Sequence, residues 1–158
     1  MSKFILSVLV ENKFGVLARV AGLFSARGFN IDSLAVGETE NPDTSRMTIV
    51  VEADDKVLEQ VKKQLNKLVD VITVQDLTGG AHVERELILI KVKAENTKIQ
   101  EKIIQIVDST GAEIVYEGKN FLTVKESANE HKINALTELL RPYGILEIVR
   151  TGKIAVSS

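Results

Sequence analysis

The chain of 158 residues contains no cysteine and no tryptophan. The lack of cysteine excludes disulfide scaffolds, thiol catalysis and zinc sites built on cysteine, and it suits a reducing cytoplasm. Aromatic residues make up 4% of the sequence and the formal net charge is −2. Nucleic-acid-binding proteins normally show a basic excess and aromatic side chains that stack on bases. We therefore expect no nucleic-acid partner.

Long apolar runs are also missing. No uninterrupted stretch approaches the ~20 apolar residues that a membrane-spanning helix needs. The N-terminus runs directly into the strand-like residues 4–10 (FILSVLV), without the basic segment, apolar segment and small-residue cleavage site of a secretory signal. The expectation is a cytoplasmic protein that does not enter a membrane.

The common catalytic motifs are absent as well. The sequence has no P-loop, no dinucleotide-binding glycine pattern, no H-E-x-x-H and no G-x-S-x-G. We interpret His82, beside two glycines, as a hinge residue and His131 as a solvated helix residue. Asp54 and Asp55 are adjacent, so their side chains diverge on a helix, and we interpret them as charge at a helix N-terminus. We expect no catalytic residue, no metal site and no cofactor on this chain.

What the sequence does contain is a repeated order of strands and helices. In the first half, apolar β-branched runs predict strands at residues 4–10, 30–36, 47–52 and 71–77. A helix is expected from Val16 to Arg27, ended by Gly28, and a second helix begins at Asp54–Asp55. Apolar residues at helical spacing form the expected core faces of these two helices: Leu17, Val20, Ala21 and Phe24 in the first, and Leu58, Val61, Leu65 and Leu68 in the second.

The same order returns in the second half. Strands are expected at residues 86–92, 113–116, 121–125 and 145–149, with a short tail at 154–156. One helix contains Ile99 and Val107, and a capping box of Ser127 and Glu130 opens the other. The prediction is an α+β chain of two tandem ferredoxin-like βαββαβ domains, each an antiparallel sheet with both helices on one face. The boundaries are a first domain at 1–78, a linker at 79–84 and a second domain at 85–158.

The first predicted sheet carries apolar residues on both of its faces. Strands 4–10 and 47–52 are apolar at successive positions, whereas the two helices can cover only one face. Domains of about 80 residues also have small cores, which favours self-association. The expectation is a homodimer in which strand edges or sheet faces of two chains pair.

The segment from Glu11 to Val20 (ENKFGVLARV) has the chemistry of a small-molecule site. A strand ends and a helix begins there, and the free N–H groups at a helix start attract anions such as a carboxylate. Gly15 permits a ligand to approach the backbone, and Asn12 can both donate and accept hydrogen bonds, which suits a zwitterion. A plain strand-to-helix turn would use the same residues. Asn30 is a second amide that could reach the ligand across a paired subunit.

Residues 11–40 (ENKFGVLARVAGLFSARGFNIDSLAVGETE) resemble the opening of the regulatory small subunit of acetohydroxyacid synthase, also called acetolactate synthase. The resemblance continues through residues 45–51 (SRMTIVV), 64–71 (QLNKLVDV) and 82–87 (HVEREL), and it covers essentially the whole chain. In that family the first half is an ACT domain, a ferredoxin-like amino-acid sensor.

The resemblance implies a regulatory subunit without an active site of its own. It would activate a catalytic large subunit that carries thiamine diphosphate, Mg²⁺ and FAD, and it would confer feedback inhibition by valine or a related branched-chain amino acid. The family places the effector between two ACT domains. The residues that would line it here are Asn12, Gly15, Val16 and Leu17 from one chain and Asn30 and Ile31 from the other.

Two segments depart from the family pattern. Phe14 stands where the family often has a proline, and residues 108–112 (DSTGA) replace a turn that commonly contains Phe-Arg.

Other interpretations of the sequence are an ACT-type amino-acid-binding regulator of another enzyme, an RNA-binding pair of ferredoxin-like domains, and an acylphosphatase-like enzyme. The RNA-binding interpretation needs basic and aromatic residues interleaved on the sheets, and the enzyme needs an Arg and an Asn beside a phosphate loop.

Overall fold

The computed structural model describes residues 2–158, and contacts divide them into two compact units. The first unit comprises residues 2–83 together with Lys153–Ser158, and the second comprises Glu84–Gly152. Each unit contains two helices and a four-stranded antiparallel path with the ferredoxin-like strand order. The predicted α+β class with two tandem βαββαβ units is confirmed.

The first unit follows the expected element order. Its elements are β1 (Ser2–Glu11), α1 (Val16–Ala26), β2 (Ile31–Glu38), β3 (Thr44–Ala53), α2 (Asp55–Lys67) and β4 (Val71–Asp76). The strands lie in the order β2-β3-β1-β4, so β2 and β4 form the edges of the sheet. Helix α2 packs against β4 and against α1.

Strand alternation builds the core between this sheet and its helices. Phe4, Leu6 and Val8 of β1 pair beside Val51, Ile49 and Met47 of β3, and all six side chains are buried. The helices contribute Val16, Val20 and Phe24 from α1, and Leu58, Val61 and Leu65 from α2. The buried face of α1 therefore begins at Val16. The expected core position Leu17 is instead exposed.

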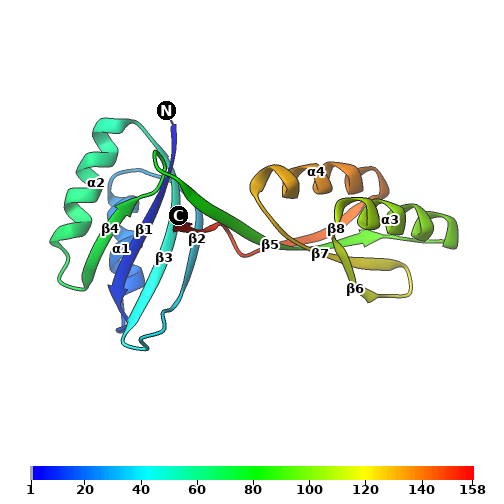
Figure 1. Cartoon of the computed structure of the whole chain (residues 1–158), viewed down its shortest axis with the longest axis horizontal. Coiled ribbons are helices and arrows are strands. Elements are labelled where there is room, and N and C mark those ends of the chain that lie inside the picture. The colour runs from blue at the N-terminus through cyan, green and yellow to red at the C-terminus, as the bar shows by residue number, and fades with distance from the viewer. Residues whose placement is uncertain (1) are drawn as a thin grey trace. The chain divides into compact units, whose positions relative to one another are not determined.

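The second unit repeats the architecture. Its elements are β5 (His82–Lys93), α3 (Thr97–Thr110), β6 (Glu113–Glu117), β7 (Phe121–Ala128), α4 (Glu130–Leu140), a 3₁₀ turn (Arg141–Tyr143) and β8 (Ile145–Arg150). The strand order is β6-β7-β5-β8, and Figure 1 shows α3 and α4 on one side of this sheet. Buried residues of β5, β7, α3 and α4 form a separate core.

Side-chain caps define where helices α2 and α4 begin. The carboxylate of Asp54 accepts the Val57 N–H at 2.9 Å, as expected for the start of α2. Asn129 accepts the Lys132 N–H at 3.0 Å and opens α4. The predicted capping box at Ser127 is wrong, because β7 runs through Ala128 and the cap falls two residues later.

The last strand, β9 (Ile154–Ser157), lies with the first unit, whereas the sequence placed it in a second domain at 85–158. It pairs with β5, and the Ser158 N–H donates to the Ala81 carbonyl oxygen at 3.1 Å. Ala155 packs on Ile5, Val50 and Leu77, on the sheet face that carries no helix (Figure 1). The chain's own C-terminus thus covers part of the apolar face for which we expected a partner. The expected linker at 79–84 differs too, since β5 already begins at His82.

Candidate effector site

The turn between β1 and α1 is held from both sides by neighbouring loops. The Glu11 N–H donates to the Asp70 carbonyl oxygen and the Asn12 N–H donates to the Asp43 carbonyl oxygen, both at 2.8 Å. Gly15 closes the turn at φ 76°, in the left-handed region that favours glycine. The sequence therefore needs a glycine at this point to turn the chain into α1.

The N-terminus of α1 is open to a ligand. Gly15 is the N-cap and provides no side-chain cap, and the Val16 N–H reaches only the Lys13 carbonyl oxygen, at 3.5 Å. The first N–H groups of a helix carry partial positive charge and lack partners within the helix. Uncapped N–H groups of this kind attract carboxylates, so the prediction that a carboxylate binds here stays a prediction.

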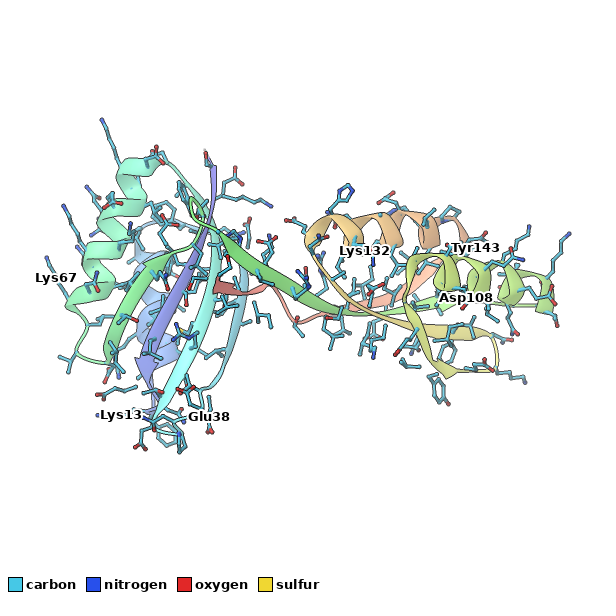
Figure 2. The ribbon with its side chains drawn as sticks, viewed as in Figure 1. Lys13, Glu38, Lys67, Asp108, Lys132 and Tyr143 are labelled. Atoms are coloured by element: carbon cyan, nitrogen blue, oxygen red, sulfur yellow. The ribbon has the colours of Figure 1, made fainter. Side chains whose placement is uncertain are left out.

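Asn12 is fastened to the β2–β3 loop. Its Nδ2 donates to Glu38 Oε1 at 3.2 Å and to the Pro42 carbonyl oxygen at 3.0 Å. Figure 2 shows the neighbouring Lys13 and Glu38 at the same end of the unit. Both hydrogens of the Asn12 amide group are donated in these bonds, and its Oδ1 remains to accept a hydrogen bond from an ammonium group. Glu38 brings a carboxylate to the same place, and sequence reasoning missed it because it lies 26 positions away.

Lys13 forms an ion pair at the exposed edge of the turn between β1 and α1. Lys13 Nζ lies 2.6 Å from Glu11 Oε2. The hydrogen bond with this carboxylate and its charge raise the pKa of Lys13, so the ammonium group stays protonated at neutral pH.

A second residue that the sequence did not reveal is Arg19. Its Nε donates to Asp70 Oδ2 at 3.1 Å, and its Nη2 bonds the same oxygen and approaches the Phe14 carbonyl oxygen at 3.5 Å. The guanidinium group therefore lies beside the turn at Phe14 and Gly15, while the side chain stays 48% exposed. The Asp70 carboxylate offsets the guanidinium charge, so the helix end keeps only the partial positive charge of its N–H groups.

The apolar candidates near Gly15 divide into buried and exposed residues. Val16 is 3% exposed and belongs to the core, so it can offer a ligand only its backbone. Leu17 is 43% exposed and Phe14 is fully exposed. The apolar contacts of an effector at this end would therefore come from Phe14 and Leu17.

Asn30 and Ile31 lie at the other end of α1. The helix has 11 residues, which corresponds to a length of about 16 Å. Asn30 is exposed in the loop before β2, whereas Ile31 is half-buried against the first core. A single chain therefore keeps Asn12 and Gly15 apart from Asn30 and Ile31, and a site that uses all of them needs two chains.

Within residues 2–158, no group of three or more His, Asp or Glu side chains is placed to hold a metal ion. In the same part of the chain, no helix has the length and apolar character that crossing a bilayer requires.

Comparison with known proteins agrees with this architecture. Residues 6–73 match the family described as the AHAS small subunit-like ACT domain, and residues 85–158 match the family described as the small subunit of acetolactate synthase. The acetolactate synthase small subunit of Mycolicibacterium smegmatis is 51% identical over 152 residues, which cover 96% of this chain and 89% of that protein. The corresponding protein of Aquifex aeolicus is 46% identical over 154 residues, covering 98% and 80%.

A solved structure is similar over its whole length. The crystal structure of the acetolactate synthase small subunit from Thermotoga maritima has a TM-score of 0.89 and 38% identity, and the match covers 100% of this chain and 98% of that one. The first unit thus has the fold and the sequence of an ACT domain. The chain belongs to the family of acetolactate synthase small subunits.

Proposed function

We propose that the protein is a cytoplasmic regulatory subunit that activates the catalytic subunit of acetolactate synthase and confers feedback inhibition by valine or a related branched-chain amino acid. The catalytic subunit, not this chain, would hold thiamine diphosphate, Mg²⁺ and FAD. The observation that carries the proposal is the uncapped N-terminus of α1 behind Gly15, beside Asn12 and the exposed Leu17.

The effector site is proposed to form between two ACT domains related by a two-fold axis. Strand β2 is an edge strand, so its outer backbone groups can pair with a second copy. Small residues on α1 support a close approach, because a Cβ added at the exposed Gly22 would meet nothing within 4 Å. A two-fold axis makes the two α1 helices antiparallel and brings Gly15 of one chain toward Asn30 of the other.

In this arrangement the effector's carboxylate would bind the N–H groups of α1 near Gly15 and Val16. Its ammonium group would meet Asn12 Oδ1 and the carboxylate of Glu38. Phe14 and Leu17 would contact its apolar side chain and disfavour polar amino acids. Inhibition is then a coupling free energy of ~1–3 kcal/mol between effector binding and the catalytic subunit, which corresponds to roughly 5- to 150-fold.

Isothermal titration of the full chain with valine, leucine and isoleucine tests the proposal. We expect heat for at least one of them, with one effector bound per chain or per pair of chains. The variant Asn12→Ala should abolish inhibition of the reconstituted enzyme and retain its activation, whereas Asn134→Ala, an exposed position on α4, should change neither. Silence for all three amino acids would remove the sensing function.

A further inference from the structure

The guanidinium group of Arg19 is held in one orientation by the residues around it. Its Nε and Nη2 both bond the same oxygen of the Asp70 carboxylate, and Nη2 also approaches the Phe14 carbonyl oxygen at 3.5 Å. Asp70 is itself fixed, because its carbonyl oxygen accepts the Glu11 N–H at 2.8 Å. The residue that orients Arg19 is therefore fastened to the end of β1.

The third nitrogen of this guanidinium group lies beside Gly15. Side chains of a helix point back toward its N-terminus, so Arg19, the fourth residue of α1, reaches the turn that precedes the helix. Its Nη1 is 3.1 Å from the position that a Cβ on Gly15 would occupy. Among residues 2–158, the acceptors that Arg19 bonds engage only Nε and Nη2, so the two N–H donors of Nη1 remain available.

We propose that Arg19 is the residue that makes the effector site specific for a carboxylate. The inference rests on the proposed function, because it assumes that an amino acid binds at the N-terminus of α1. One carboxylate oxygen would bind the N–H groups near Val16, and the other would accept a hydrogen bond from Arg19 Nη1. Hydrogen bonds between charged partners are roughly twice as strong as those between neutral groups, so this contact favours ligands that carry a carboxylate.

Asp70 is a positioning residue in this arrangement. A free arginine side chain samples many rotamers, and ordering it when a ligand binds lowers the affinity. The Asp70 carboxylate orders the guanidinium group beforehand. It also offsets the guanidinium charge, so Arg19 presents the effector with two directed N–H donors rather than a general attraction for anions.

The test compares valine, leucine and isoleucine with their amides, which keep the side chain and the ammonium group but lack the carboxylate. Titration of the full chain followed by NMR measures weak as well as tight binding and gives the preference for each amino acid over its amide. We expect Arg19→Gln to weaken amino-acid binding on the order of 10- to 100-fold and to leave amide binding unchanged. Arg19→Lys keeps one charged donor group and should show an intermediate preference.

Two control variants separate this role from a structural one. Asp70→Asn removes the carboxylate that orders Arg19 but retains the guanidinium group, so we expect weaker binding with the preference for the amino acid preserved. Arg141→Gln removes an exposed arginine that bonds Glu138 at 2.9 and 3.1 Å in the second unit, and it should bind both ligands like the native chain. Thermal unfolding of each variant establishes that it is folded.

The inference fails if folded Arg19→Gln and Arg19→Lys chains keep the native preference for the amino acid over its amide. An equal loss of that preference in Arg19→Gln and Asp70→Asn would also overturn it, because Arg19 would then only hold the turn. A native chain that binds none of the three amino acids would instead refute the proposed function, and this inference with it.

Discussion

Replacing Gly15 with alanine tests the effector site through a change of one methyl group. Gly15 adopts φ 76°, where a Cβ clashes with the following carbonyl group at a cost of about 1–2 kcal/mol. The new Cβ would also lie 3.1 Å from Arg19 Nη1, so the guanidinium group that bonds Asp70 must shift. For a domain of this size, each kcal/mol lowers the melting temperature by about 4–8 °C.

Gly111→Ala is the matched control. Gly111 has φ 81° at the end of α3, and an added Cβ would meet only the end of the Lys132 side chain at 3.9 Å. The backbone strain is therefore comparable, but it falls in the second unit. Scanning calorimetry should show a similar loss of stability in both variants.

Valine affinity separates the two variants. The Cβ of Gly15→Ala projects at the N-terminus of α1, where the carboxylate is proposed to bind, so we expect affinity to fall about tenfold or more, or at least ~1.4 kcal/mol. Gly111→Ala should bind valine like the native chain. Native affinity in a folded Gly15→Ala chain, or equal losses in both variants, would refute this reasoning.

Two further predictions concern stability. Deleting residues 153–158 should uncover Ile5 and Val50, and we expect the first unit to lose about 1–2 kcal/mol and to bind an apolar fluorescent dye; an unchanged melting transition would contradict the packing of β9. Arg150→Ala should cost about 2–4 kcal/mol in chemical denaturation, because it leaves the 6%-exposed carboxylate of Glu86 without its two-bond partner. The hydrogen bond to the Glu86 carboxylate raises the pKa of Arg150, so Arg150 should stay protonated at every pH at which the protein is folded. The destabilisation caused by Arg150→Ala should therefore persist at pH 9, and its loss at that pH would contradict this.

Local patterns were sufficient for most of the element order. The apolar β-branched runs of β1 and β3, the apolar spacing of α2 and the start of that helix at Asp54–Asp55 are properties of neighbouring residues, and each was predicted correctly. Errors occurred where two local patterns competed. At α1 both Val16 and Leu17 fit a helical apolar face, and only packing against the sheet selects Val16.

The candidate site was predicted in part for the same reason. Gly15 and Asn12 lie in a turn whose chemistry depends on adjacent residues, so the sequence indicated them directly. Glu38, which bonds Asn12, lies 26 positions further along the chain. Asp70, which bonds Arg19, lies 51 positions further along. No local pattern marks them, because strand register brings them there.

The sequence by itself thus determined two βαββαβ units, the glycine turn before α1 and the need to cover the second face of the first sheet. Tertiary structure decided what covers that face: residues beyond the second unit return as β9. Hydrophobicity specifies that a surface must be buried, but it is not directional. Which segment covers the face depends on the long-range strand pairing that brings that segment next to it.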